Sequence, residues 1–262
     1  MGGTKVLMAL FKDDGTLMSS HKFPTSHDYS QFLTDFRQEF TSLGAYDLRG
    51  AGIAVPAMLD RQNGRAVHFG NLPWEDVPLL RDFQAIVSCP VVLENDAKAG
   101  AVYQAHNVSN EFKKMLYIAV GTGVGVAYTS DGVLDTAFGD DGGRSIMIAQ
   151  EDGTTISWDH LASGKAIYER FGQKASEITD PEAWKVIAHN LALGILQLLP
   201  IFDTEVIVFG GGVGAHLEHF EKFLSTEIAQ SRPTLPRPTI RMGIKPEEAV
   251  VYGCFELAKQ AT

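Results

Sequence analysis

The chain has 262 residues, of which 45% are hydrophobic and 21% charged, which is the composition of an ordinary globular protein. Lysine and arginine number 22 against 32 aspartate and glutamate, a formal charge of −10, and this argues against nucleic acid as a partner because phosphate backbones are held by cationic side chains. No apolar stretch is long enough to suggest a membrane span, and the two cysteines are interpreted as free thiols in a reducing, cytoplasmic compartment.

The first hundred residues alternate apolar runs with amphipathic segments. We expect strands over residues 5–10, 16–23, 49–55 and 91–93, and helices over residues 29–43, 77–83 and 97–105. In the first of these helices Phe32, Phe36 and Phe40 recur at helical spacing on one face, and Asp28 can cap its start. The stretch 56–74 is interrupted by glycine and proline and is interpreted as a loop.

The rest of the chain continues this alternation. Strands are expected over residues 115–120, 124–129 and 206–209 and after the proline-rich loop 232–238, with helices over residues 163–171, 181–202, 217–224 and 247–259. Strands that alternate with helices throughout predict the α/β class. On the apolar helix His189 is expected to be an interior residue, and Trp74, Trp158 and Trp184 are expected to pack in the cores.

Three glycine turns, each beside an apolar strand, are the strongest functional signal: Gly2-Gly3-Thr4-Lys5, Gly121 to Gly125 and Gly210 to Gly214. Glycine lets backbone amides approach phosphate oxygens without a Cβ in the way. One such turn indicates only a tight bend, whereas three in an α/β chain favour nucleotide binding. The first two lead into strands and only the third opens a helix, so the pattern favours phosphate-binding hairpins over a Rossmann fingerprint.

Glu94-Asn95-Asp96 lies at the end of an expected strand, a usual place for ligand chemistry in α/β sheets. Phosphoryl transfer to an alcohol needs a carboxylate that accepts the hydroxyl proton and polar groups that fix the substrate. An Asn–Asp pair supplies both, although the same residues can equally cap the helix that follows. Asn71, in a loop with proline and tryptophan, is by itself interpreted as a turn residue.

Together these residues resemble the ROK family (repressor, open reading frame, kinase), bacterial sugar kinases of the actin–hexokinase superfamily. The end of the family's DIGGTK motif is similar to MGGTK, its Gly-x-x-x-Pro-Gly-x-x-Asp stretch to AGIAVPAMLD, and its sugar-contacting loop to GNLPWEDVPL. Its strand with Glu-Asn-Asp-Ala resembles PVVLENDAKAGA, and its second phosphate motif resembles YIAVGTGVGVA. The family order continues with ASGKAI, VIVFGGGVG and YGCFELA, so the resemblance covers nearly the whole chain.

The resemblance implies an α/β fold of the actin-like ATPase (ribonuclease H-like) type, with two lobes around a cleft. The first lobe would be residues 1–106, joined by the C-terminal helix 248–262, and the second would be residues 107–247. The implied activity is ATP-dependent phosphorylation of a hexose or related sugar, with Mg²⁺ on the phosphates. The implied assembly is a homodimer.

The resemblance also assigns roles to individual residues. Asp96 would be the catalytic base. The sugar would be held by Asn71, Asn95, Asp96, Asp141 and Arg144. ATP would lie against Gly3, Thr4, Lys5, Thr122, Gly123, Gly211 and Gly212.

One departure from the family concerns its Glu-x-Gly-His motif, whose histidine binds a structural zinc together with a cysteine cluster. The matching stretch here is Asp141-Gly142-Gly143-Arg144, and residues 150–159 contain no cysteine. Aspartate keeps an acceptor, but arginine stays protonated and cannot ligate a metal, so no zinc is expected. Arg144 would either contact an acidic or strongly accepting substrate or pair with Asp140 or Asp141.

A second departure concerns the N-terminus, where Met1 stands directly before the first glycine turn. In the family an apolar strand, and an aspartate that helps to organise the metal and the phosphate, come before this turn. By analogy the strand would lie in the middle of the first lobe's sheet. We expect a misplaced start codon or a truncated chain that lacks roughly half a dozen residues; the alternative is a natural chain whose phosphate site lacks its first carboxylate.

Two other functions stay open. The substitutions at residues 141–144 favour a catalytically weak sugar-binding or regulatory protein on a kinase scaffold, whereas the Asn95-Asp96 pair opposes this function. Polyphosphate is the second alternative, as a donor in place of ATP. A repressor is not expected, since no DNA-binding segment comes before the first glycine turn.

Overall fold

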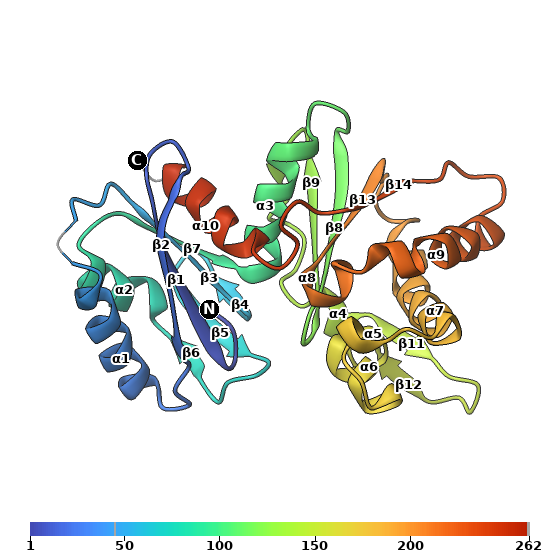
Figure 1. Ribbon diagram of the computed structural model, residues 1–262, viewed down its shortest axis with the longest axis horizontal. Helices are drawn as coiled ribbons and strands as arrows, with labels where there is room; N and C mark the ends of the chain where they lie inside the picture. Colours follow the sequence, from blue (N-terminus) through green and yellow to red (C-terminus); the bar gives the residue numbers. More distant parts are fainter. Residues whose placement is uncertain (45, 261–262) are drawn as a thin grey trace. The chain divides into compact units, whose positions relative to one another are not determined.

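In the computed structural model, which describes residues 1–44 and 46–260, the chain forms two α/β units (Figure 1). Unit 1 is Met1–Tyr103 together with the chain from Val250 onward, and unit 2 is Gln104–Ala249. Each unit has its own hydrophobic core. The α/β class predicted from the alternation of elements is confirmed.

Unit 1 contains three small sheets and the helices that pack on them. Its antiparallel hairpin is β1 (Lys5–Phe11) with β2 (Leu17–Pro24), its parallel pair is β3 (Ala51–Val55) with β7 (Val91–Asn95), and its antiparallel sheet is β4 (Ala57–Asp60), β5 (Arg65–Phe69) and β6 (Glu75–Val77). Its helices are α1 (Tyr29–Ser42), α2 (Leu79–Val87), α3 (Asp96–Val108), which runs past the boundary, and α10 (Ala249–Gln260).

The interpretation of residues 56–74 as a loop is wrong, because β4 and β5 lie within this stretch and β6 directly follows it. The strands are only three to five residues long, too short for a clear alternation of apolar and polar residues. The local signal was Asn63-Gly64, a pair typical of hairpin turns, and Gly64 has a φ of +64°. Asp60 accepts a hydrogen bond from the Asn63 backbone and fixes this turn.

An aromatic cluster forms the core of unit 1. Asp28 caps α1 by accepting a hydrogen bond from the Gln31 N–H at 2.7 Å, as predicted. Phe32 and Phe36 on this helix are buried. Trp74 is also buried, 4.7 Å from the Phe32 ring centroid, which confirms its expected packing role.

Helix α10 returns the end of the chain to unit 1 and carries Cys254. Burial raises the pKa of the Cys254 thiol to about 11, and the backbone of Ala54 on β3 is hydrogen-bonded to it. The ordinary pKa of a cysteine thiol, which applies in the unfolded chain, is 9.0. Between this value and about 11, the thiol is therefore protonated in the folded protein and ionised in the unfolded chain.

We expect the free energy of unfolding to decrease as the pH rises from about 9 to about 11. In this window the unfolded state loses the thiol proton while the folded state keeps it. The contribution of this thiol to the free energy of unfolding is therefore complete below pH 9 and is lost as the pH rises through the folded-state pKa. Urea unfolding at several pH values measures the slope. Cys254→Ala is the matched variant, and equal slopes for the two proteins would contradict the prediction.

Unit 2 is built on a five-stranded mixed sheet with the strand order β10-β9-β8-β13-β14. Its strands are β8 (Lys114–Val120), β9 (Val124–Ser130), β10 (Val133–Leu134), β13 (Val206–Gly210) and β14 (Thr239–Met242), with a separate hairpin of β11 (Met147–Ala149) and β12 (Thr155–Ser157). Its helices are α4 (Gly142–Ser145), α5 (Trp158–Ala162), α6 (Gly164–Phe171), α7 (Pro181–Leu198), α8 (Gly211–Gly214) and α9 (Leu217–Ser231), with a 3₁₀ turn at Ala175–Glu177.

Helix α7 crosses the core of unit 2, where Trp158 of α5 packs against it. A Cβ on Gly194 would lie 2.1 Å from the Trp158 ring, so only glycine fits there. The Trp158 indole N–H donates to the carbonyl of Asn190 at 3.0 Å. Trp158 and Trp184 are buried, as expected. The expectation for His189 is wrong: its side chain is 52% exposed and lies 3.3 Å from Glu227, because it falls on the solvent side of the helix.

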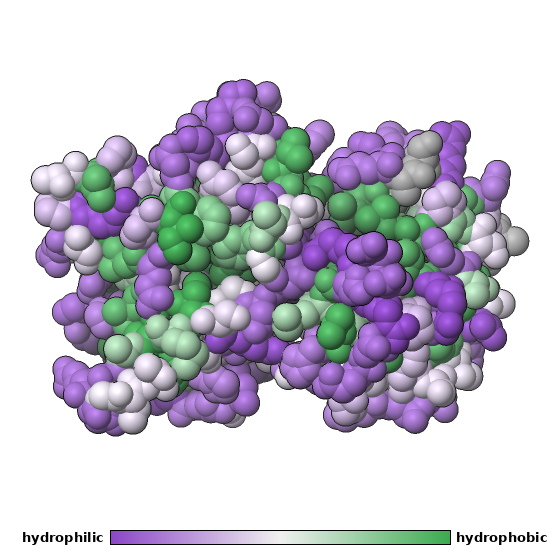
Figure 2. Space-filling view, turned by 180° about the vertical axis from the view of Figure 1, so that it is seen from behind, coloured by the Kyte–Doolittle hydropathy of each residue, from purple (hydrophilic) through white to green (hydrophobic). Residues whose placement is uncertain are grey.

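No helix among residues 1–44 and 46–260 is both long and apolar enough to cross a membrane. On the face drawn in Figure 2, hydrophilic and hydrophobic residues are interspersed. Scattered apolar residues are normal on the surface of a folded protein.

Candidate active site

In unit 1, Asn95 and Asp96 stand at the junction of β7 and α3. Asn95 is buried, and its carboxamide oxygen accepts hydrogen bonds from the N–H groups of Ala97 at 3.0 Å and Lys98 at 3.3 Å. It therefore caps α3, while its amide nitrogen donates to the carbonyl of Ala57. Asp96 is half-buried and accepts from the Ala97 N–H at 2.9 Å. The positive end of the helix dipole favours an ionised carboxylate there.

A partly buried ion pair between Arg61 and Glu94, the residue before Asn95, supports this junction. Glu94 is 5% exposed and accepts hydrogen bonds from the Arg61 guanidinium through both carboxylate oxygens. It also accepts from the Asn95 N–H at 2.7 Å. Arg61 lies just after β4, 33 residues before Glu94. Sequence patterns did not single out Arg61, because no local spacing reveals a partner so far along the chain.

The first glycine turn lies beside Asn71. A Cβ on Gly3 would lie 2.6 Å from the Asn71 Cβ, so these two predicted residues are in direct contact. Thr25 fixes the turn from β2's end: its hydroxyl donates to the Gly2 carbonyl at 2.9 Å, and its N–H donates to the Thr4 carbonyl. Asn71, Thr4 and Lys5 are exposed.

In unit 2 the second glycine turn connects β8 to β9. The Asp159 carboxylate accepts a hydrogen bond from the Val124 N–H at 2.7 Å. A Cβ on Gly123 would lie 2.7 Å from the same carboxylate oxygen, so glycine is required for this approach. In the described part of the chain, the N–H groups of Thr122 and Gly123 donate to no protein acceptor. Asp159 is a second residue that sequence reasoning missed.

Two helices begin beside this turn. The Gly164 N–H at the start of α6 donates to the Gly121 carbonyl at 2.7 Å. Gly211 at the start of α8 has a φ of +77°, and a Cβ there would lie 2.5 Å from the Val120 carbonyl oxygen. The second and third glycine turns of the sequence are thus brought together. A Cβ on Gly212 would meet no atom within 4 Å, so the space beside α8 is open.

The stretch that departs from the family motif forms the short helix α4. A Cβ on Gly143 would lie 2.0 Å from the Val124 carbonyl oxygen, so α4 packs on the strand that follows the second glycine turn. The Asp141 carbonyl accepts from the Arg144 N–H at 3.1 Å, and its carboxylate accepts from the Ser145 hydroxyl at 3.3 Å. Within residues 1–44 and 46–260 the Arg144 guanidinium forms no ion pair, so the expected alternative of a pair with Asp140 or Asp141 is not found.

The residues that would carry a zinc-binding cysteine cluster form the β11–β12 hairpin instead. The Gln150 N–H donates to the Thr154 carbonyl at 2.8 Å and closes it. Gly153 has a φ of +83° in its turn. In the family, a bound zinc is the expected support of this segment. Here backbone hydrogen bonds hold the β11–β12 hairpin together.

Elemental analysis of the purified protein is expected to find no stoichiometric zinc. The resemblance matches Arg144 to the family's metal-binding histidine, and a guanidinium has no lone pair to donate to a metal. Mass spectrometry of the dialysed protein, with a zinc-binding protein as the positive control, measures the metal content. One zinc per chain would show that residues 141–144 are wrongly matched to the family motif.

The chain was compared with known proteins. The model of the ROK family matches residues 1–261. The chain belongs to the ROK family. This confirms the family inferred from the Glu-Asn-Asp-Ala and Gly-Thr-Gly motifs, in which Asn95, Asp96 and the second glycine turn stand.

Family members of known name and structure are similar over most of the chain. A fructokinase of Zymomonas mobilis is 26% identical over 81% of the chain and 77% of its own length. A glucokinase of Halalkalibacterium halodurans is 26% identical over 87% of the chain and 86% of its own length. The crystal structure of a ROK family glucokinase from Streptomyces griseus, in complex with glucose and AMPPNP, superposes with a TM-score of 0.84 at 20% identity and covers 99% of this chain and 97% of that one. The expected actin-like ATPase fold is therefore confirmed.

Proposed function

We propose that this protein transfers a phosphoryl group from ATP to a hydroxyl group of a hexose or related sugar, with Asp96 as the general base. The observation that carries the proposal is the position of Asp96, which is the first residue of α3 and directly follows Asn95 at the end of β7. The named relatives from Zymomonas mobilis and Halalkalibacterium halodurans, a fructokinase and a glucokinase, support a sugar as the acceptor.

The polar groups around Asp96 have different functions in this proposal. Asn95 orients the junction, because its side chain is committed to the cap of α3 and to Ala57. Asn71 is exposed beside Gly3 and is available to a sugar hydroxyl. Asp96 accepts the proton of the attacking hydroxyl, which makes the oxygen a better nucleophile as its bond to phosphorus forms.

The donor, ATP as its Mg²⁺ complex, fits the second glycine turn. The N–H groups of Thr122 and Gly123 have no acceptor among the described residues, and a Cβ on Gly121 would meet nothing within 4 Å. Free amides on an open glycine turn suit phosphate oxygens. Gly211 packs against this turn at the start of α8, and the open space beside Gly212 suits the adenosine.

Arg144 and Asp141 support a sugar with a strong hydrogen-bond acceptor. The Arg144 guanidinium has no carboxylate partner in the structure as described, and a free guanidinium binds acceptor groups through a planar fork of donors. We propose that this side chain selects the substrate, with Asp141 as a second contact. The sugar would then carry a carboxylate, an amide carbonyl or a comparable acceptor.

A panel of donors and sugars tests the proposal. Purified protein is incubated with ATP or polyphosphate and with neutral hexoses, N-acetylated hexosamines or sugar acids, and sugar phosphate is measured directly. Turnover with ATP supports the kinase, and turnover with polyphosphate alone would replace ATP as the donor. Sugar binding by calorimetry without turnover for any donor would overturn the kinase proposal in favour of a sugar-binding regulatory protein.

A further inference from the structure

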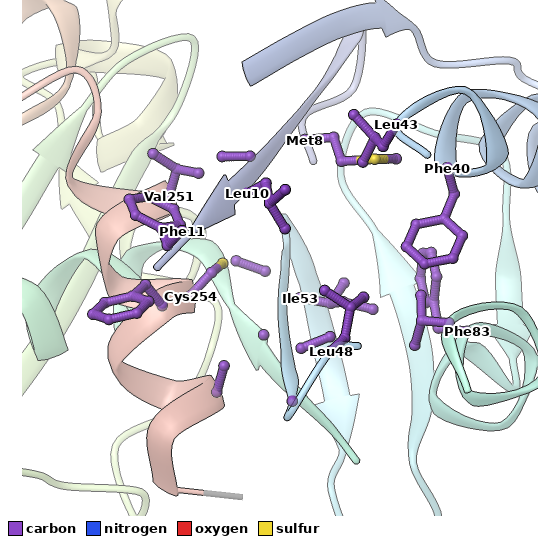
Figure 3. A pocket seen from close by; sticks show the side chains of 18 of the residues that line it. Met8, Leu10, Phe11, Phe40, Leu43, Leu48, Ile53, Phe83, Val251 and Cys254 are labelled. Atoms are coloured by element: carbon purple, nitrogen blue, oxygen red, sulfur yellow. The ribbon is translucent and has the colours of Figure 1, made fainter. Parts of the chain in front are cut away.

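A cavity in unit 1 and a cluster of polar side chains in unit 2 differ in the ligands they offer. The cavity has a volume of about 720 Å³, and the side chains labelled in Figure 3 are apolar except for the Cys254 thiol. They present no imidazole or carboxylate. The cluster consists of His216, Glu218 and His219, and it is the one group of three such ligands found among residues 1–44 and 46–260.

The backbone that carries the cluster is the turn from α8 into α9. The His216 N–H donates to the Val213 carbonyl at 3.0 Å, and the His216 carbonyl accepts from the His219 N–H at 3.1 Å. Leu217 and Phe220, in the first turn of α9, are buried in the core of unit 2. Hydrogen bonds and packing therefore fix the backbone from which the three side chains project.

A buried tryptophan stands behind the two imidazoles. Trp184 belongs to α7, which packs beside α9 (Figure 1), and its indole N–H donates to the Ile178 carbonyl at 3.1 Å. The His219 ring stacks on this indole with a centroid distance of 5.2 Å and an interplanar angle of 20°, and the His216 centroid lies 6.1 Å from it. Because Trp184 is held in the core, it restricts the rotamers of both rings, and less side-chain entropy is lost when the rings bind one ion.

The ligand atoms of the cluster are close together and open to solvent. One ligand atom from each side chain can be chosen so that all three lie within 4.8 Å of one another. The His219 Nε2 lies 3.7 Å from the Glu218 carboxylate, which is too long for a hydrogen bond. The side chains of His219 and Glu218 are 48% and 61% exposed, so an ion can reach them from solution.

We infer that His216, Glu218 and His219 form a binding site for one divalent late transition-metal ion such as Zn²⁺ or Ni²⁺. Two imidazoles and one carboxylate are a ligand set that holds Zn²⁺ and leaves a further position for water. Two ligands of a tetrahedral zinc ion lie about 3.3 Å apart, so small side-chain rotations bring these atoms into place. Imidazole nitrogen also selects such ions over Mg²⁺, which prefers oxygen ligands.

The surroundings of the site limit the strength of binding. The first turn of α9 is the positive end of a helix dipole, where a cation is disfavoured, and the Glu218 carboxylate offsets this repulsion. With exposed ligands and an open position, the ion exchanges with solution, and dialysis removes it. The site shares no residue with the stretch 141–144 or with the proposed kinase site, so the inference depends on neither.

Tryptophan fluorescence tests the inference without reference to activity. Of the three tryptophans of the chain, Trp184 is the one that stacks on an imidazole of the cluster, and Ni²⁺ quenches a nearby indole. Ni²⁺ titrated into the metal-free full chain is expected to quench part of the emission saturably, at micromolar concentrations. Calorimetry with Zn²⁺ is expected to give one ion per chain, and millimolar Mg²⁺ is expected to leave both titrations unchanged.

Two substitutions and a matched control locate the ion. Glu218→Gln and His219→Gln are each expected to weaken the binding of both ions at least about tenfold, because loss of a group that only orients a ligand already costs about 10- to 100-fold. His189→Gln is the control, since this histidine is also exposed on a helix of unit 2 but lies beside Glu227, outside the cluster. It is expected to bind both ions as the parent does.

The exposed position of Glu218 keeps the test decisive. Glu218→Gln preserves the size of the side chain, and its Tm without metal is expected to equal that of the parent within about 1 °C, so weaker binding cannot be assigned to unfolding. Binding only at millimolar metal would overturn the inference, as would equal affinities for the parent and the Glu218→Gln and His219→Gln proteins. An equal loss of affinity in the His189→Gln protein would also overturn it, since the ion would then not be held by the cluster.

Discussion

Asp96→Asn is expected to lower kcat about 10²- to 10⁴-fold, the usual effect of removing a positioned general base. The amide keeps an oxygen that can accept from the Ala97 N–H, as the Asp96 carboxylate does, so the start of α3 is preserved. The affinity for the sugar is expected to stay within a few-fold, since size and acceptor are retained. Steady-state kinetics on the substrate found with the panel measures kcat, and calorimetry measures sugar binding.

Asp47→Asn is the matched control, because this exposed aspartate in unit 1 forms no ion pair with any described residue. It should leave both quantities unchanged. Full turnover of the Asp96→Asn protein would remove Asp96 from the mechanism. Loss of folding, seen as a lower Tm, would instead assign to Asp96 a structural role at the start of α3.

Arg61→Met is expected to destabilise the protein by about 3 kcal/mol, because it leaves the Glu94 carboxylate buried without its partner. The Glu94 side chain is 7% exposed and that of Arg61 30% exposed, so water can replace the guanidinium only in part. This loss corresponds to a Tm lower by about 6–12 °C. Urea unfolding of both proteins at one pH measures the difference in free energy.

The double variant Arg61→Met with Glu94→Gln separates the two contributions. Without a buried charge, the pair of substitutions is expected to cost less than Arg61→Met alone. Glutamine keeps an oxygen for the hydrogen bond from the Asn95 N–H. If the Arg61→Met protein is as stable as the parent, the ion pair does not contribute to the stability of the β7–α3 junction.

Local sequence patterns correctly predicted the strands and helices that contribute apolar residues to the two cores. The strands β8 and β13 are continuous apolar runs that stay buried in the sheet of unit 2, and helix α1 has its aromatic residues on one face. The short strands β4 to β6 were missed because pairing with neighbours, and not their own periodicity, makes them strands. His189 was misplaced because an apolar helix still has one side toward solvent.

The residues of the candidate site also fall into two groups, those that the sequence revealed and those that it did not. Glycine turns and the Asn95-Asp96 pair are visible in the sequence because their chemistry is concentrated in consecutive residues. Arg61 and Asp159 are not, since each acts on a group more than thirty residues away, on Glu94 and on the Val124 N–H. Whether Arg144 forms an ion pair likewise depends on the distances between side chains in the folded chain, and the sequence does not give these distances.

Trp158 and Asp159 are consecutive in the chain but hold different parts of unit 2. The indole of Trp158 is fastened to α7 over Gly194, while the Asp159 carboxylate holds the N–H of Val124 at the end of the second glycine turn. Close-packed interiors are stiff and transmit displacements, so the turn shares the rigidity of the core and lacks the mobility of a surface loop. An anion that binds its amides meets a preorganised surface, and little conformational entropy is lost on binding.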